Sequence, residues 1–319
     1  MAKVLVTGGA GFIGSHTTEA LLARGDEVIC LDNFNDYYDP ARKHKNVALF
    51  AENPRYRLYE GDIRDAEALE SLFAAERPDK VIHIAAMAGV RYSIQHPELY
   101  EAVNVRGLLN TLEVARRYEV RNFVFASSSS VYGADSPVPF REDAPCDRPI
   151  APYPATKRAG ELFCYSYHHL YGLACTCLRF FTVYGPRGRP DMAPYLFTRW
   201  VFDGEPLKMF GDGTTYRDYT YIDDIVAGVV AALDAGLAYE IINLGNSQTV
   251  TLRKFIEIVE ELTGRRANVV SLPLQPGDVP RTYADVSKAR RLLGYDPKTP
   301  FVEGMARFVA WYRQEVRGE

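Results

Sequence analysis

The sequence predicts an α/β fold in which a doubly wound parallel sheet is followed by a smaller C-terminal lobe. Three observations predict it. Short apolar runs alternate with helical segments through the first half of the chain, a glycine-rich turn follows the first run, and the alternation loosens beyond Gly185. Because this alternation is typical of βαβ units, helices should cover both faces of the sheet. The 319 residues suffice for one large α/β unit or for two domains.

The order of the elements along the chain predicts six or seven parallel strands. Short apolar runs predict strands at Lys3–Thr7, Glu27–Leu31, Tyr56–Glu60, Lys80–Ile84, Asn122–Ala126, Ala174–Phe180 and Ile241–Leu244. Apolar residues that recur every three or four positions predict helices at Phe12–Arg24, Ala66–Glu76, Glu98–Tyr118, Pro154–Tyr171, Asp224–Leu233 and Leu252–Thr263.

Prolines and glycines indicate where the chain changes architecture. Prolines crowd the segment between Pro137 and Pro154, which is therefore expected to be a surface loop. A second group follows Gly185 and suggests a crossing into another lobe. We expect residues 1–184 to form the first domain, with 222–263 returning to it, and residues 185–319 to form the smaller lobe.

Charge and cysteine content exclude several function classes. The chain has 37 Lys and Arg against 41 Asp and Glu, so it lacks the basic excess that binding a nucleic-acid backbone requires. It shows no apolar stretch of the roughly 18 residues that span a membrane and no secretory leader, so we expect a cytoplasmic protein. The five cysteines are irregularly spaced and predict neither a disulfide framework nor a metal site.

The first turn predicts a dinucleotide site. Gly9, Gly11 and Gly14 form G-x-G-x-x-G between a predicted strand and a predicted helix, where the backbone can approach a pyrophosphate. Asp32 ends the second strand about 20 residues further on, where a carboxylate binds the ribose hydroxyls and repels a 2′-phosphate. The sequence therefore predicts a Rossmann domain that prefers NAD to NADP.

The loops that follow the other strands should complete this cofactor site at the carboxyl edge of the sheet. Asp62 and Ile63 follow the third strand and could meet the adenine, and Ala85, Ala86 and Ala88 follow the fourth, where the pyrophosphate and nicotinamide ribose would pass. The full set of expected cofactor contacts is Gly8, Gly11, Phe12, Ile13, Gly14, Asp32, Asn33, Asn35, Asp62, Ile63, Ala85, Ala86, Ala88, Asn104, Tyr153 and Lys157.

A tyrosine and a lysine one helical turn apart suggest proton-transfer chemistry. Tyr153 and Lys157 lie at i and i+4 and so share one face of a predicted helix. A nearby ammonium is what allows a tyrosine, with an ordinary pKa near 10, to act as a base. Four serines, Ser127–Ser130, leave the fifth strand at the edge where ligands bind, and could hold sugar oxygens.

Together with Asn104 in the long helix, these motifs resemble the extended short-chain dehydrogenase/reductase family, whose members remodel nucleotide-linked sugars. The resemblance runs over almost the whole chain and implies that Ser128, Tyr153 and Lys157 are the catalytic set. Three stretches, Asn33–Pro40, Ala88–Ser93 and Phe181–Met192, are similar to those of the UDP-glucuronic acid 4-epimerases within that family.

This closer similarity implies a UDP-sugar substrate and NAD as a bound cofactor. It implies that Arg217, Arg281 and Asp278 lie around the UDP diphosphate and ribose. Related dehydratases and decarboxylases carry an acidic residue where this chain has Ser130, and many epimerases of neutral sugars carry Asn where it has Thr182. UDP-glucose 4-epimerase and, further off, UDP-glucuronate decarboxylase remain alternatives, and the nucleotide could be dTDP.

An epimerase of a uronate must also hold the sugar carboxylate, because a 4-keto uronate is a β-keto acid that readily loses carbon dioxide. Ser129, Ser130 and Thr182 are the residues we expect to hold that carboxylate, with charge from Arg187 or Arg91. A redox sensor or scaffold on the same fold is the non-enzymatic alternative, and it would not need Tyr153 beside Lys157.

The two long helices carry more apolar surface than one buried stripe uses. We expect a homodimer through these faces, with coverage by the chain's own C-terminal half as the alternative.

Overall fold

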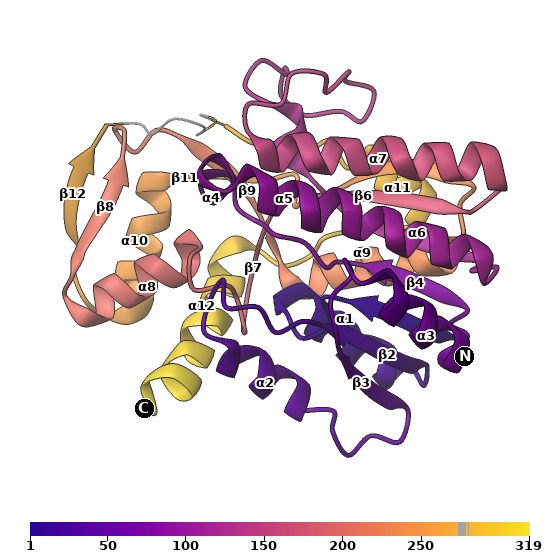
Figure 1. Ribbon diagram of the computed structural model, residues 1–319. Coiled ribbons are helices and arrows are strands. Elements are labelled where there is room, and N and C mark those ends of the chain that lie inside the picture. Colours follow the sequence, from indigo (N-terminus) through magenta and orange to yellow (C-terminus); the bar gives the residue numbers. More distant parts are fainter. Residues whose placement is uncertain (274–278, 280) are drawn as a thin grey trace.

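The computed structural model describes residues 1–273, 279 and 281–319. Seven parallel strands form the main sheet in the order β10-β6-β5-β4-β1-β2-β3 (Figure 1). They are β1 (Lys3–Thr7), β2 (Glu27–Asp32), β3 (Tyr56–Glu60), β4 (Lys80–His83), β5 (Asn122–Ser128), β6 (Cys175–Phe180) and β10 (Tyr239–Leu244). The predicted doubly wound α/β fold is confirmed. The last of the predicted strands, Ile241–Leu244, is part of β10, which lies at the edge of this sheet.

Alternate residues of the strands face two different helical layers, as a doubly wound sheet requires. On one face, α1 (Phe12–Ala23) and α9 (Ile222–Ala235) bury their leucines and valines against residues such as Val4 and Val124. On the other, α3 (Ala66–Glu76), α6 (Gly107–Arg117) and α7 (Pro152–Tyr171) pack on residues such as Leu5 and Phe123.

The long helix predicted between Glu98 and Tyr118 is interrupted. It consists of α5 (Pro97–Glu101), a π-helical turn (Ala102–Arg106) and α6. In the first half of the chain, two helices were not predicted: α2 (Pro40–Ala48), which Asp39 caps by accepting the Ala41 N–H at 3.0 Å, and α4 (Val90–Gln95). Both are short, and neither carries a clean apolar stripe in the sequence.

The smaller lobe contains a two-stranded and a three-stranded sheet with helices around a separate aromatic core. Its elements are β7 (Thr182–Tyr184), α8 (Ala193–Asp203), β8 (Pro206–Phe210), β9 (Tyr216–Tyr221), β11 (Thr249–Thr251), α10 (Leu252–Thr263), β12 (Asn268–Leu272) and α12 (Phe301–Tyr312). The chain ends in a π-helical turn (Arg313–Arg317), and α11 (Ser287–Leu293) packs on α9 and β10.

The return to the large sheet is made by part of the segment 222–263. The helix α9 and the strand β10 lie with the large sheet, whereas α10 packs against α8 and α12 in the smaller lobe. Phe255 explains this placement, because its fully buried ring contacts Phe197 of α8 and Phe301 of α12. The hydrophobic stripe of α10 therefore faces an aromatic core rather than the strands.

All five cysteines are buried and free of disulfides. Within the described residues, no helix is long and apolar enough to cross a membrane. The same residues hold no group of three or more His, Cys, Asp or Glu arranged to bind a metal ion.

Candidate active site

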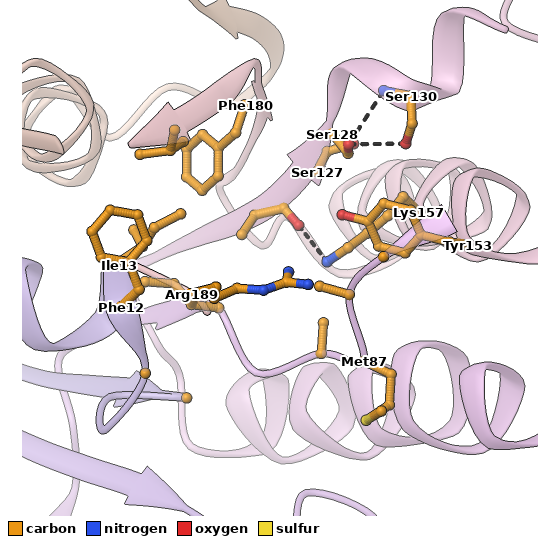
Figure 2. A pocket seen from close by; sticks show the side chains of 18 of the residues that line it. Phe12, Ile13, Met87, Ser127, Ser128, Ser130, Tyr153, Lys157, Phe180 and Arg189 are labelled. Atoms are coloured by element: carbon orange, nitrogen blue, oxygen red, sulfur yellow. Dashed lines mark hydrogen bonds between the residues drawn. The ribbon is translucent and has the colours of Figure 1, made fainter. Parts of the chain in front are cut away.

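A cavity of about 430 Å³ opens at the carboxyl ends of the parallel strands, bordered by loops of the smaller lobe (Figure 2). Most of the residues that the sequence indicated come together in its wall. Those residues are Gly8, Gly11, Phe12, Ile13, Gly14, Asp32, Asn33, Asn35, Ile63, Ala85, Ala86, Ala88, Ser128, Ser129, Ser130, Tyr153, Lys157, Thr182 and Arg217. The main sheet and the three-stranded sheet, through Thr182 of β7 and Arg217 of β9, thus contribute to one site.

The glycine turn has the geometry of a phosphate cradle. Gly8 has a positive φ of 71°, and a Cβ there would lie 2.7 Å from the backbone nitrogen of Ala85. A Cβ on Gly14 would lie 2.1 Å from the Gly8 carbonyl oxygen, so only glycine allows α1 to start this close to the turn. No side chain caps the N-terminus of α1 at Gly11, which leaves its first amides for an anion. The turn therefore fits the dinucleotide pyrophosphate.

Asp32, the last residue of β2, lies beside the glycine turn, where an adenosine-binding carboxylate is expected. It accepts the backbone N–H of Phe34 at 2.9 Å and that of Ala10 at 3.2 Å, so its orientation is fixed. Lys43, which the sequence analysis did not select, is buried in the cavity wall with its Nζ 3.5 Å from Asp32 Oδ1. Its position on α2, a helix absent from the predicted elements, is why it was missed.

A Gly14→Ala variant is expected to lose bound NAD, because the added methyl meets the Gly8 carbonyl and pushes α1 away from the turn. Cofactor content is measured by releasing the nucleotide from the purified protein and quantifying it. The matched control is Gly204→Ala, which strains a positive φ of 70° at the end of α8 but meets nothing within 4 Å. Equal NAD content in the two variants would contradict the assigned cradle.

The first turns of α7 place a tyrosine and a lysine on the same face, toward the cavity (Figure 2). Lys157 Nζ donates to the carbonyl of Ala126 at 2.7 Å, and burial lowers its pKa to about 7. Burial raises the pKa of Tyr153, while a hydrogen bond with Ser128 and the charge of Arg189 oppose that rise. A proton-transfer group is therefore held in a cavity wall with its hydroxyl in contact with a second hydroxyl.

The serines after β5 divide into two groups. Ser128 Oγ accepts from the Ser130 backbone N–H at 3.2 Å and from the Ser130 hydroxyl at 2.9 Å, and both residues line the cavity. Ser127 is buried and donates its hydroxyl proton to Glu161 at 2.7 Å. Ser127 also borders the cavity, but its hydroxyl is bound to a buried carboxylate on α7, so this hydroxyl is not free to hold a sugar oxygen.

Arg189 is the main cavity residue that the sequence analysis missed. Its guanidinium extends across the cavity toward Tyr153 (Figure 2). It pairs with Asp191 at 2.6 Å and lies 5.4 Å from the centre of the Tyr37 ring, and Tyr37 donates to Asp191 at 3.0 Å. These contacts join the loop after β2 to the loop after β7 over the cavity.

Arg187 was expected to face the substrate, and the structure places it elsewhere. It does not line the cavity; its guanidinium contacts His16 and Glu19 on α1. Both arginines lie in the same loop, and their ion-pair partners distinguish them: Arg187 pairs with Glu19 on α1, and Arg189 pairs with Asp191.

Asp62 and Asn104 lie behind the cavity wall rather than in it. Asp62 binds Asn33 at 2.8 Å and is held by Arg64, which lowers the pKa of this carboxyl to about 2. Asn104, on the π-helical turn, accepts the Met87 N–H at 2.8 Å and donates to Thr156 at 3.0 Å. Both expected cofactor contacts therefore support cavity residues in this structure.

The remaining expected substrate residues lie near the smaller lobe. Arg91 is exposed on α4 with its guanidinium 5.2 Å from the Phe210 ring centre, and Arg281 is exposed beside β9, where its backbone bridges to Tyr216. Neither lines the cavity, although Arg217, one residue beyond that bridge, does. Asp278 lies outside the described residues.

Comparisons with known proteins agree with this geometry. The model of the "NAD dependent epimerase/dehydratase family" matches residues 4–245. A UDP-glucuronate 4-epimerase of Thermodesulfobacterium geofontis is 44% identical over 317 residues, covering 99% of this chain and 98% of that protein.

Solved structures extend the similarity to the fold. The UDP-glucuronic acid 4-epimerase of Bacillus cereus, in complex with UDP-glucuronic acid and NAD, has a TM-score of 0.93 and 36% identity, covering 98% of this chain and 99% of that one. The UDP-glucose 4-epimerase of Thermotoga maritima, with UDP-glucose, has a TM-score of 0.90 and 34% identity over the same shares.

Proposed function

Because this chain belongs to the NAD dependent epimerase/dehydratase family, we propose that it interconverts UDP-glucuronic acid and UDP-galacturonic acid by inverting C4 of the sugar. The observation that carries the proposal is that Ser128, Tyr153 and Lys157 border one cavity, together with the glycine turn that fits NAD. This arrangement places a proton-transfer group beside a residue that can hold the reacting hydroxyl.

The proposed roles of the residues follow from their positions. Gly8, Gly11 and Gly14 hold the pyrophosphate of NAD, Asp32 holds the adenosine ribose, and Arg217 is the candidate for the UDP diphosphate. The first domain, 1–184 without β7 but with β10 and α9, would carry the cofactor, and β7 with the rest of 185–319 would carry most of the nucleotide-sugar site.

Bound NAD would accept a hydride from C4 and return it to the other face of the sugar. In the proposed mechanism, Tyr153 removes the proton of the C4 hydroxyl, directly or through Ser128, and gives it back after the 4-keto sugar has turned. Arg189 supplies positive charge that favours the phenolate form of Tyr153. Lys157, one helical turn further along α7, would add to this charge when it is protonated.

The turned intermediate must keep its carboxylate. A 4-keto uronate loses carbon dioxide most easily when the C5–C6 bond overlaps with the carbonyl π system. Ser129, Ser130 and Thr182 line the cavity, and their hydroxyls would donate to a carboxylate in a fixed orientation, Ser130 by turning its proton from Ser128 to the carboxylate. We propose that these three hydroxyls restrain the carboxylate. Arg187, which was expected to supply positive charge there, pairs instead with Glu19 on α1.

The test is to incubate purified protein with UDP-glucuronic acid, without added cofactor, and to identify products by proton NMR. UDP-galacturonic acid is the expected product. Conversion of UDP-glucose to UDP-galactose with no reaction of the uronate would favour the alternative that the Thermotoga maritima relative represents. Release of carbon dioxide as the main outcome would contradict the proposed restraint of the carboxylate.

We also propose that the protein is a cytoplasmic homodimer. Large apolar side chains are exposed together on α7, namely Leu162, Tyr165, Leu170 and Tyr171. A second copy of the same helix offers a matching surface in a two-fold arrangement. Five free buried thiols suit a reducing compartment.

A further inference from the structure

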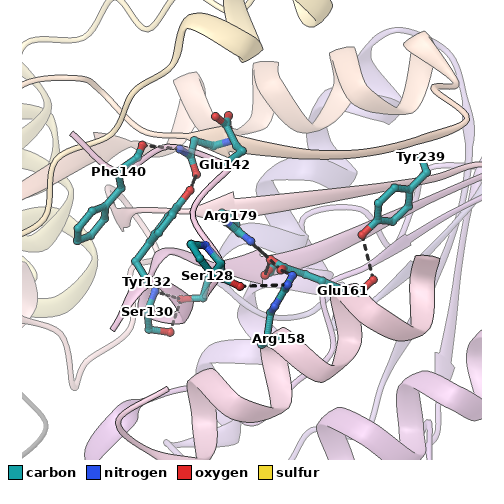
Figure 3. Close-up of polar contacts among 12 residues, drawn as sticks. Ser128, Ser130, Tyr132, Phe140, Glu142, Arg158, Glu161, Arg179 and Tyr239 are labelled. Carbon is teal, nitrogen blue, oxygen red and sulfur yellow. Dashed lines mark hydrogen bonds and ion pairs between the residues drawn. The ribbon is translucent and has the colours of Figure 1, made fainter. Parts of the chain in front are cut away.

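A fully buried ion pair lies beneath the serines of the active site (Figure 3). Arg179 on β6 and Glu161 on α7 are both inaccessible to solvent and form two parallel hydrogen bonds, Nε to Oε1 at 2.8 Å and Nη2 to Oε2 at 2.9 Å. The paired guanidinium keeps the pKa of Glu161 below its usual value. Glu161 therefore remains a carboxylate with both oxygens oriented.

The same carboxylate connects the helix that carries Tyr153 to the strand that carries Ser128. Tyr153, Lys157 and Glu161 follow one another at intervals of four residues along one face of α7. Lys157 donates to the carbonyl of Ala126, and Glu161 accepts the hydroxyl of Ser127, both at 2.7 Å. Two consecutive turns of the helix are thus hydrogen-bonded to two consecutive residues of β5, directly before Ser128.

The far end of the serine segment is held by the same ion pair. The turn η2 (Ser129–Tyr132) ends in Tyr132, whose ring centre lies 4.7 Å from the guanidinium carbon of Arg179. Within the described part of the chain, Arg179 Nη1 is buried with no hydrogen-bond partner, and the guanidinium lies over that ring. Tyr132 also donates to Asn243 of β10 at 2.7 Å. Residues 127–132 are therefore attached at both ends.

We propose that Glu161, with Arg179, is a positioning residue that fixes the hydroxyls of Ser128 and Ser130 relative to Tyr153. It acts through Ser127 at one end of the segment and Tyr132 at the other, without touching the substrate. This role rests on the proposed epimerase function. In that function, the attachment of residues 127–132 to the ion pair controls two properties. One is proton transfer between Ser128 and Tyr153, and the other is retention of the sugar carboxylate.

The second property follows from the competing reaction of the intermediate. When a 4-keto uronate decarboxylates, the C5–C6 bond breaks, carbon dioxide leaves, and the electron pair forms a C4–C5 enolate that takes a proton at C5. The product is a 4-keto pentose with no change in oxidation state elsewhere. If the serine hydroxyls are not held in place, the sugar carboxylate can rotate. The C5–C6 bond can then overlap with the π system of the C4 carbonyl, which decarboxylation requires.

The variant that tests the proposal is Ser127→Ala, since it removes one attachment and leaves the Glu161–Arg179 pair intact. We expect kcat to fall about tenfold or more with KM changed less than about twofold, because misplacement affects the reacting groups rather than binding. The share of decarboxylated product, followed by proton NMR, should rise. The control is Ser166→Ala, which deletes a hydroxyl bonded to the Leu162 carbonyl on the exposed face of α7.

A spectroscopic readout keeps the test independent of turnover. The Tyr153 phenolate is titrated by ultraviolet absorbance, with Tyr153→Phe protein as the reference. Because the Ser128 hydrogen bond lowers the pKa of Tyr153, Ser127→Ala should raise it relative to wild type, and Ser166→Ala should not.

The outcomes separate the two proposals. If wild-type protein fails to convert UDP-glucuronic acid, the proposed function is wrong. The kcat values of wild type and the variants are then measured with UDP-glucose as the substrate, and the Tyr153 titration still tests the positioning role. If Ser127→Ala matches wild type in kcat, product ratio and Tyr153 titration, the positioning role of Glu161 is wrong. Equal losses in Ser127→Ala and Ser166→Ala would also overturn it.

Discussion

Replacing Tyr153 by phenylalanine is expected to reduce kcat for C4 inversion by about 10²–10⁴-fold or more, the range that one acid–base group contributes. Phenylalanine keeps the ring in the cavity wall and removes only the hydroxyl that contacts Ser128. The loss should therefore appear in kcat, with KM and bound NAD close to wild-type values. The measurement is conversion of UDP-glucuronic acid by proton NMR, together with cofactor content.

The matched control for this variant is Tyr165→Phe. Tyr165 lies on the same helix but is half exposed, away from the cavity. A Tyr153→Phe enzyme within about tenfold of wild type would remove Tyr153 from the proton-transfer role. The role would then have to pass to another cavity hydroxyl, such as that of Ser128.

The largest expected effect on stability comes from breaking the Glu161–Arg179 pair on one side. Arg179→Met should lower the free energy of unfolding by about 3–5 kcal/mol, because it leaves a buried carboxylate without its main counter-charge. That is a large part of the roughly 5–15 kcal/mol that a native protein has in total. Combining Arg179→Met with Glu161→Leu should restore most of the loss, since no buried charge is left unpaired and Arg158, which also pairs with Glu161 at 2.8 Å, is partly open to solvent. Urea unfolding at neutral pH measures all three proteins.

The effect of pH on this comparison has a definite sign. In wild type the pKa of Glu161 is lowered, so its stabilising contribution is present above the ordinary carboxyl pKa and is lost as pH falls. In Arg179→Met, burial without the partner raises the pKa, so the penalty is full at neutral pH and shrinks as the carboxyl takes up a proton. The difference between the two proteins should therefore be smaller at pH 5 than at pH 7.5. A difference that grows on acidification would contradict the assignment.

The parts of the fold that the sequence predicted best are those set by local pattern. The apolar runs at Lys3–Thr7 and Tyr56–Glu60 match strands residue for residue, and the glycine turn lies between β1 and α1 as expected. The predicted helix Leu252–Thr263 is present as α10. Its apolar face did not indicate which elements it packs against. A helix with one apolar face fits a sheet or an aromatic core equally well, and long-range packing makes the choice.

The same distinction explains the site. Gly14, Asp32 and Tyr153 are recognisable because each has a fixed spacing to a neighbouring element. Arg189 and Arg187 differ by two positions in an irregular loop, and only the three-dimensional partners Asp191 and Glu19 show which one enters the cavity. Glu161 was overlooked because its partner Arg179 lies on a strand 18 residues away. Pairings of this kind arise from tertiary structure and have no local signature.

The place of β10 at the edge of the main sheet also determines the order in which the protein can be completed during synthesis. Every residue of β6 is buried, and one of its two neighbours is β10, which is made only after much of the smaller lobe. Until residues 239–244 leave the ribosome, β6 is an uncovered apolar edge on a growing chain, the kind of surface that pairs with other chains. A nascent chain paused within residues 185–238 should therefore be the form most dependent on chaperones.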